Sequence, residues 1–166
     1  VIIDLNWREV FWHHSTFSSQ KSEKEILNLI QIFLNYANIL KLAKEEAEFF
    51  FNNENPLYIS EKLLNRPDVI ITDGGGPVSW HINGLQGKTQ IINSSKIIDT
   101  TGAGDAFLGG FISKLISTGY PSSESEIQNY VSFASVCGLL TCFGEGAIEQ
   151  QPDYSKVSEF FGSQIL

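Results

Sequence analysis

The chain has 166 residues, enough for one domain of ordinary size and too few for two. Apolar residues make up 42% and charged residues 18%, so the chain can bury a core, and this composition argues against a disordered protein. The net charge of -8 argues against a broad nucleic-acid interface, which needs clustered Lys and Arg. No apolar run approaches the roughly 18 residues that would span a bilayer, and residues 1–3 are too short for a signal peptide.

The two cysteines, Cys137 and Cys142, match neither a disulfide framework nor a zinc pattern. We predict that both are buried free thiols in a reducing compartment, and we expect a cytoplasmic protein. The sequence contains no methionine, and residues 1–4 (VIID) already read as part of a strand. We therefore expect further residues before Val1 in the natural protein.

Short apolar runs alternate with amphipathic segments in the first part of the chain. Ser22 followed by Glu25 is the pattern of a capping box and marks a helix start. Residues 7–19 read as a loop, and Leu63 and Leu64 are expected to face inward from a helix. The patterns predict strands over 1–6, 38–42 and 68–72, and helices over 22–36, 43–52 and 56–65.

In the second part, Asn83-Gly84 is a strong hairpin signal between strands expected over 78–82 and 89–92. Three helices are expected to follow, over 103–118, 124–142 and 153–161. No linker or internal repeat interrupts this order. Strands that alternate with helices predict a single α/β domain with a mostly parallel sheet, to which the hairpin adds a local antiparallel pair.

The most informative segment is residues 99–107, D-T-T-G-A-G-D-A-F. The small residues Gly102, Ala103 and Gly104 allow a tight turn, and an amphipathic helix follows at once. Their backbone amides would therefore lie at a helix N-terminus, which attracts anions. Asp105 in the first helical turn would lie within reach of a hydroxyl that attacks a bound phosphate. The alternative is that Asp105 merely caps the helix after a glycine turn.

Two stronger phosphate motifs are absent, because the sequence has neither G-x-x-x-x-G-K-[ST] nor G-x-G-x-x-G after a strand. Instead, residues 99–107 resemble the second signature of the ribokinase-like (PfkB) carbohydrate kinases. Five further segments agree with this family in the expected order. They are D-x-N-x-R over 4–8 followed by Trp12, the region 37–48, the strand and turn over 69–74, and the stretches 133–138 and 146–148.

The resemblance implies a ribokinase-like three-layer αβα domain with a mostly parallel sheet. It further implies that residues 1–166 are the C-terminal nucleotide-binding and catalytic-base part of such a domain, with the N-terminal half and the lid absent. The implied reaction is ATP-dependent phosphoryl transfer to a sugar hydroxyl, as in fructokinases. Mg²⁺ is the implied cofactor, with a monovalent cation such as K⁺ in some relatives.

Residue roles follow from the matching positions. In the family, the aspartate that ends G-A-G-D is the catalytic base, so Asp105 inherits that role. The amides of Gly102, Ala103 and Gly104 would form the anion hole. Asn6 and Arg8, in the D-x-N-x-R segment, and Lys41 are expected near the nucleotide phosphates. For both Arg8 and Lys41 the alternative is a solvated ion pair.

On the nucleotide side, Thr72 and Gly74 match the turn at the end of a strand, and Ser135 replaces an asparagine beside the adenine. Glu46 matches the glutamate that helps to hold magnesium water, although the asparagine of that element is Ala43 here. The alternative for Glu46 is a solvated helix face.

Asp99 and Thr101, with Gly146, match positions that bind a monovalent cation in some relatives. A further departure from the family pattern is Pro77, which stands where a glycine is usual.

These departures support a second hypothesis, a fructokinase-like protein that has lost catalysis and acts as a binding or structural partner. A third hypothesis keeps the kinase but changes the acceptor to 2-keto-3-deoxygluconate or a nucleoside. The expected partners are ATP and a small sugar, without nucleic acid or membrane, and the chain is a candidate homodimer. We expect the isolated 166 residues to phosphorylate no sugar.

Overall fold

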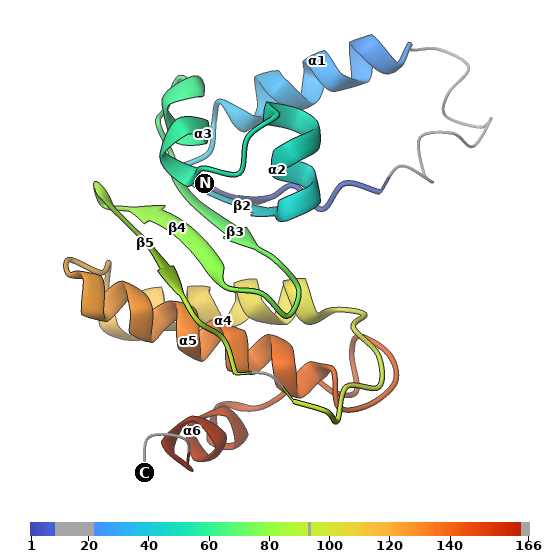
Figure 1. Ribbon diagram of the computed structural model, residues 1–166, viewed down its shortest axis with the longest axis vertical. Coiled ribbons are helices and arrows are strands. Elements are labelled where there is room, and N and C mark those ends of the chain that lie inside the picture. Colours follow the sequence, from blue (N-terminus) through green and yellow to red (C-terminus); the bar gives the residue numbers. More distant parts are fainter. Residues whose placement is uncertain (9–21, 93, 164–166) are drawn as a thin grey trace.

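The computed structural model describes residues 1–8, 22–92 and 94–163, so Trp12 and most of the predicted loop over 7–19 lie outside the described residues. One five-stranded sheet runs in the order β1-β2-β3-β4-β5 (Figure 1). Its strands are β1 Ile2–Asp4, β2 Ile39–Ala43, β3 Asp68–Thr72, β4 Val78–Ile82 and β5 Leu85–Thr89. β1, β2 and β3 pair in parallel, whereas β4 is antiparallel to both of its neighbours. Only β4 therefore runs against the others, which confirms a mostly parallel sheet.

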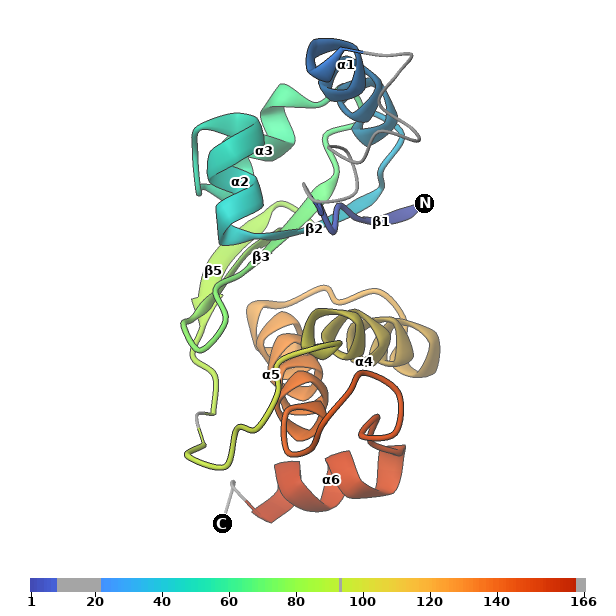
Figure 2. The same cartoon turned by 90° about the vertical axis from the view of Figure 1, so that its right-hand side faces the viewer.

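Helices cover both faces of the sheet (Figure 2). α1, α2 and α3 lie on one face and α4 and α5 on the other, while α6 packs against the outer side of the α4–α5 layer (Figures 1 and 2). The helices are α1 Glu23–Leu34, α2 Lys44–Phe51, α3 Pro56–Lys62, α4 Ala103–Thr118, α5 Glu124–Thr141 and α6 Tyr154–Ser163. The predicted αβα layers are thus confirmed. Among the described residues, no helix combines the length and the apolar character needed to cross a membrane.

The local signals at two element starts are confirmed. The Ser22 hydroxyl accepts from the Glu25 amide at 3.4 Å, and the Glu25 carboxylate accepts from the Ser22 amide at 2.7 Å, so the capping box opens α1. Asn83 and Gly84 both have positive φ angles, 50° and 75°, as a two-residue hairpin turn with the twist of its strands requires.

Two predictions about element ends are wrong. The strand expected over 89–92 instead spans Leu85–Thr89, because a two-residue turn forces pairing to resume directly at Leu85 opposite Ile82. Leu64 was expected to face inward and is 87% exposed, whereas Leu63 is 2% exposed. α3 ends at Lys62 and Leu63 adopts an extended conformation, so the helical periodicity no longer applies to Leu64.

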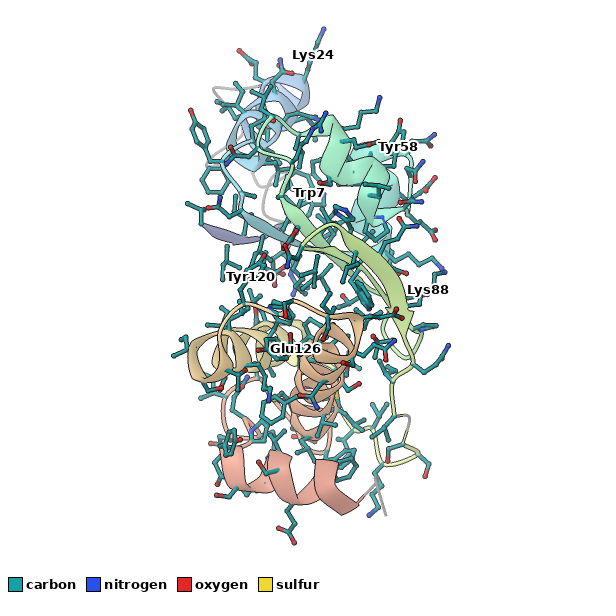
Figure 3. All side chains as sticks on the ribbon, turned by 90° about the vertical axis from the view of Figure 1, so that its left-hand side faces the viewer. Trp7, Lys24, Tyr58, Lys88, Tyr120 and Glu126 are labelled. Atoms are coloured by element: carbon teal, nitrogen blue, oxygen red, sulfur yellow. The ribbon has the colours of Figure 1, made fainter. Side chains whose placement is uncertain are left out.

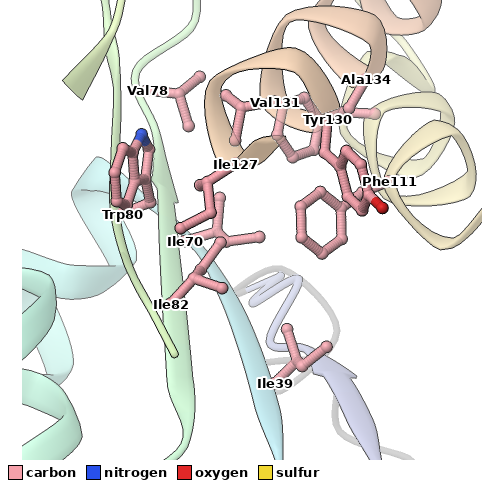
Figure 4. Packing of buried hydrophobic residues seen from close by; sticks show 11 residues of the cluster. Ile39, Ile70, Val78, Trp80, Ile82, Phe111, Ile127, Tyr130, Val131 and Ala134 are labelled. Atoms are coloured by element: carbon pink, nitrogen blue, oxygen red, sulfur yellow. The ribbon is translucent and has the colours of Figure 1, made fainter. Parts of the chain in front are cut away.

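Alternating residues of the central strands build two cores. Ile70 packs with the residues that face α4 and α5, while its neighbours Val69 and Ile71 pack with those that face α1, α2 and α3. Figure 4 shows the first of these cores, in which Trp80 of β4 is fully buried. Its indole N–H donates to the Thr89 hydroxyl at 2.9 Å, so the burial of Trp80 leaves no polar atom unpaired.

Side chains fill the space between the sheet and the α4–α5 layer (Figure 3). At one end of this interface, the Tyr120 hydroxyl donates to the Asp68 carboxylate, which joins the α4–α5 connection to β3. Burial, followed by the hydrogen bond to Asp68, raises the pKa of Tyr120 above its ordinary value. The phenol therefore remains a neutral donor at physiological pH.

Glycines let α4 and α5 approach closely. A Cβ at Gly110 would lie 2.6 Å from the Cys137 sulfur and 3.1 Å from the Ala134 Cα, and a Cβ at Gly138 would lie 2.9 Å from the Ala103 carbonyl oxygen. Cys137 and Cys142 are both buried and free, as predicted. Burial raises the pKa of Cys137 to about 11, so this thiol stays protonated.

Neighbouring glycines of α4 offer a matched test of this packing. We expect Gly110→Ala to destabilise the protein by about 1–3 kcal/mol, because the methyl group would overpack the contact with α5. Gly109 has no atom within 4 Å of an added Cβ, so Gly109→Ala should stabilise by up to about 1 kcal/mol through helix propensity. Urea denaturation of both variants measures the difference. Equal free energies of unfolding for the two variants would contradict the close packing.

Candidate functional site

The turn before α4 is built on Gly102. This residue has φ 80° and ψ -1°, a left-handed conformation that favours glycine. A Cβ at this position would also lie 2.7 Å from the Ala147 Cβ, because the loop after α5 packs directly on the turn. Both constraints explain why a glycine opens α4, and the predicted turn and helix start are confirmed.

Backbone amides at the start of α4 are available to a ligand. The Ala106 amide makes the first helical bond, to the Gly102 carbonyl at 2.9 Å, and the Ala103 amide donates to the Thr100 carbonyl at 3.2 Å. Ala103 therefore uses its amide inside the turn, contrary to the anion-hole role expected for it. Within the described residues, the amides of Gly102, Gly104 and Asp105 have no backbone partner. Such groups carry the positive end of the helix dipole.

A polar cavity of about 180 Å³ lies in front of this turn. Its lining comes from the end of β1, from β2 and from the start of α4. The lining residues are Asp4, Asn6, Arg8, Lys41, Thr100, Thr101, Gly102, Gly104 and Asp105. The structure thus brings together seven of the predicted site residues, and only Asp4 and Thr100 among the nine were not predicted.

Asp105 is exposed at the edge of this cavity, and its carboxylate has no hydrogen-bond partner among the described residues. A carboxylate with free lone pairs can accept a proton from a ligand hydroxyl. Asn6 has a positive φ of 45°, which turns the chain sharply after β1. The turn directs the chain toward Arg8, an exposed residue of the same cavity.

Lys41 makes a buried ion pair, not the solvated one that was its alternative. Its ammonium donates to both carboxylate oxygens of Asp4, at 2.9 and 3.1 Å, and Lys41 is 5% exposed. A Cβ at Gly104 would lie 2.9 Å from the Lys41 Nζ. The ammonium therefore rests directly against the turn that carries the free amides.

A second, mostly apolar cavity of about 200 Å³ adjoins the first. Thr72, Gly74, Ala103 and Ser135 line it, and Thr100 and Gly104 line both cavities. The nucleotide-binding role expected for Thr72, Gly74 and Ser135 stays a prediction. Its apolar walls were not predicted and come from Val78, Ile91, Ile92, Ile97, Phe107, Leu139 and Cys142. An apolar cavity next to a polar one suits a ligand with a flat ring and an anionic tail.

Two hydroxyls in the apolar cavity are already engaged. Ser135 donates to the Val131 carbonyl at 2.8 Å and Thr72 to the Leu42 carbonyl at 3.4 Å. Each hydroxyl can still accept a hydrogen bond from a ligand. Burial raises the pKa of the Cys142 thiol, which is therefore a neutral part of the wall.

Asp99 ties two loops together. Its carboxylate accepts from the amide and the hydroxyl of Thr101, at 2.9 and 2.7 Å, and from the Gly146 amide at 3.0 Å. The structure thus joins the three residues that match a monovalent-cation site in some relatives. Hydrogen bonds, first that from the Thr101 hydroxyl, hold the pKa of Asp99 below its ordinary value. The cation itself stays a prediction.

Glu46 is 8% exposed, which excludes the solvated helix face that was its alternative. Its two carboxylate oxygens accept from the Trp7 amide at 2.5 Å and from the Ala43 amide at 2.7 Å. Glu46 therefore fastens the segment after β1 to the start of α2.

Neither Glu46 nor Asp99 lines the cavity beside Asp105, and the described residues contain no cluster of three His, Cys, Asp or Glu able to hold a metal. Because Mg²⁺ in proteins usually keeps several waters and needs only one or two carboxylates, the role of Glu46 in holding magnesium water stays a prediction. A magnesium ion in the polar cavity would be bound mainly by ligand phosphates.

Comparison with known proteins gives a consistent result. The model of the pfkB family of carbohydrate kinases matches residues 5–153. The chain is 30% identical to a fructokinase of Salmonella typhimurium over 156 residues, which cover 92% of this chain and 48% of the relative. It is 28% identical to fructokinase-1 of Zea mays over 160 residues, 93% of this chain and 46% of the relative.

Solved structures agree with the fold. A fructokinase of Xylella fastidiosa with bound ATP superposes with a TM-score of 0.83 at 22% identity, over 100% of this chain and 52% of that one. A fructokinase of Vibrio cholerae in its fructose-, ADP- and calcium-bound form gives 0.79 at 25% identity, over 96% and 50%. The fold is therefore ribokinase-like, as expected, and the chain spans about half the length of these relatives.

The hydrogen bonds of Asp99 lead to a pH prediction. Because the folded pKa is lowered, the stabilisation is fully present above the unfolded pKa of about 3.9 and is lost as the pH falls through the folded value. We expect Asp99→Asn to be less stable than wild type at neutral pH, by a margin that shrinks as the pH falls below the unfolded pKa of about 3.9. Urea denaturation across this range measures the margin, and a margin that does not change with pH contradicts the prediction. Thr101→Val should move the pKa of Asp99 back up.

Proposed function

Because the chain belongs to the pfkB family of carbohydrate kinases, we propose that it supplies the nucleotide site and the catalytic base for transfer of the γ-phosphoryl group of ATP to a sugar hydroxyl. One observation carries this proposal. The free carboxylate of Asp105 and the free amides at the start of α4 share a cavity with Arg8 and Lys41, next to an apolar cavity.

The two cavities match the two ends of a nucleotide. The adenine ring would lie against the apolar walls, among which Phe107 and Leu139 come from α4 and α5. The phosphates would extend past Gly104, which lines both cavities, toward the amides. Gly104 suits this passage because it has no side chain to occupy the space in which the two cavities meet.

The transferring phosphoryl group would be stabilised by fixed donors. The amides of Gly102, Gly104 and Asp105 add the positive end of the α4 dipole to the charges of Arg8 and Lys41. These groups would balance the negative charge on the phosphoryl oxygens as the bond to the leaving ADP breaks. Within a chain of net charge -8, these donors thus offset the carboxylates of Asp4 and Asp105 that line the same cavity.

Asp105 would act as the general base. Its carboxylate accepts the proton of the sugar hydroxyl while that oxygen attacks the γ-phosphorus, and the oxygen that bridges the β- and γ-phosphorus atoms leaves with ADP. Fructose is the acceptor we propose first, because the curated relatives are fructokinases and the Vibrio cholerae relative is described in a fructose-bound form. The residues that recognise the sugar would come largely from the half of the enzyme that this chain does not span.

The proposal predicts a specific loss in Asp105→Asn. In the full-length protein, we expect sugar-dependent ADP release to fall by about 10²–10⁴-fold, because asparagine cannot accept the proton. Nucleotide affinity should change little, since the Asp105 amide is kept. Asp153→Asn is the matched control, because Asp153 only caps α6 and asparagine also serves as a cap.

Two outcomes would count against the proposal. Turnover of Asp105→Asn at the wild-type rate would remove Asp105 from the reaction. The second measurement is a calorimetric titration with Mg·ATP up to about 1 mM nucleotide, a Kd that corresponds to a binding free energy of about -4 kcal/mol. If it detects no binding, the result favours the inactive binding protein instead.

A further inference from the structure

We infer that Asp4 is a positioning residue that holds the Lys41 ammonium at the phosphate side of the α4 turn. The inference rests on the proposed function, since it assigns a role within the same cavity. Asp4 and Lys41 both line that cavity, together with Gly104 and Asp105. Asp4 would not touch the substrate itself but would act through the lysine.

The sheet register creates this pair. Asp4 of β1 and Lys41 of β2 are direct partners in a parallel ladder, so their side chains leave the sheet on the same face. That face is the one toward α4, because Ile39, two residues before Lys41, packs in the α4–α5 core. Lys41 is thus a buried cation in a strand whose neighbouring positions are apolar.

The hydrogen bonds of the ammonium leave one donor for a ligand. An ammonium has three N–H groups, and two of them are used by the Asp4 oxygens at 2.9 and 3.1 Å. A Cβ added to Gly104 would lie only 2.9 Å from the Nζ, so the turn limits the movement of the ammonium on the side away from Asp4. The remaining N–H can therefore be offered to a phosphoryl oxygen in the polar cavity.

A purely structural role accounts poorly for this arrangement. Removing two charges from water is costly, and apolar residues of similar size often stabilise a core as well as a buried ion pair does. A second Asp–Lys pair in the chain, Asp73 with Lys44 at 3.1 Å, shows the ordinary case, because its side chains are 37% and 39% exposed. The side chains of Lys41 and Asp4 are only 7% and 13% exposed, and they stand at the candidate reaction site.

The kinetic test uses four full-length proteins: wild type, Asp4→Asn, Lys41→Met and the double variant. Asp4→Asn keeps the shape of the side chain but removes its charge. We expect it to lower kcat by about 10- to 100-fold, because the ammonium is no longer held in place. KM for ATP should stay level or fall, since a negative charge has left a phosphate site. The double variant should be no slower than Lys41→Met alone.

Three outcomes would overturn the inference. The first is a wild-type kcat in Asp4→Asn. The second is the same fold-loss from Asp4→Asn in the Lys41→Met background, which would show that Asp4 does not act through Lys41. The third is a parallel loss of kcat, ATP affinity and thermal midpoint in Asp4→Asn, which is the signature of a structural role. Asp153→Asn serves again as the remote control with the same chemical change.

A second measurement needs no turnover. The ammonium of Lys41 is followed by ¹⁵N NMR, with its signal assigned by its loss in Lys41→Arg, while inorganic tripolyphosphate is added as the probe. We expect the signal to shift in wild type and to be broadened or lost in Asp4→Asn before any addition. If the wild-type ¹⁵N signal of Lys41 does not shift when tripolyphosphate is added, the positioning role fails even in an active kinase. If it responds in a protein that phosphorylates no sugar, the proposed function fails and the positioning role stands.

Discussion

Close backbone contact between α4 and α5 is the constraint on which the candidate site depends. At Gly138 and Gly110 the two helices approach so closely that neither position has room for a side chain. The first turn of α4 carries Asp105 and the free amides, so its distance from the ends of β1 and β2 is set by this packing. Because protein interiors are densely packed and transmit strain, a change in the α4–α5 contact would move the whole turn relative to Lys41.

On the proposed function, an acidic protein would hold a polyanion. The net charge of -8 repels phosphates at long range, although salt screens this repulsion beyond about 8 Å at physiological ionic strength. At short range, Arg8, Lys41 and the free backbone amides line one cavity of about 180 Å³, where they offset the carboxylates of Asp4 and Asp105. Amides add positive potential without adding a titratable group, so this part of the field does not change with pH.

Much of the fold and part of the site could be predicted from the sequence because they depend on local patterns. The glycine turn at 102–104 and the periodicity of the helices are signals of this kind. The prediction of a strand over 89–92 was wrong because Ile91 and Ile92 are apolar for a different reason. They line the wall of the apolar cavity and do not belong to a strand. The Asp4–Lys41 pair spans 37 residues and arises from strand register, and Glu46 is engaged by a distant amide. No local pattern encodes such contacts.

The division of the site into two adjoining cavities has an evolutionary consequence. Among the described residues, only Thr100 and Gly104 line both, so the surface for a nucleobase and the surface for phosphoryl chemistry are nearly separate sets. On the proposed function, substitutions at Ile97 or Leu139 would reshape the surface for the nucleobase while the reacting groups stay in place. The surface for the base can therefore change within this fold independently of the groups that carry the chemistry.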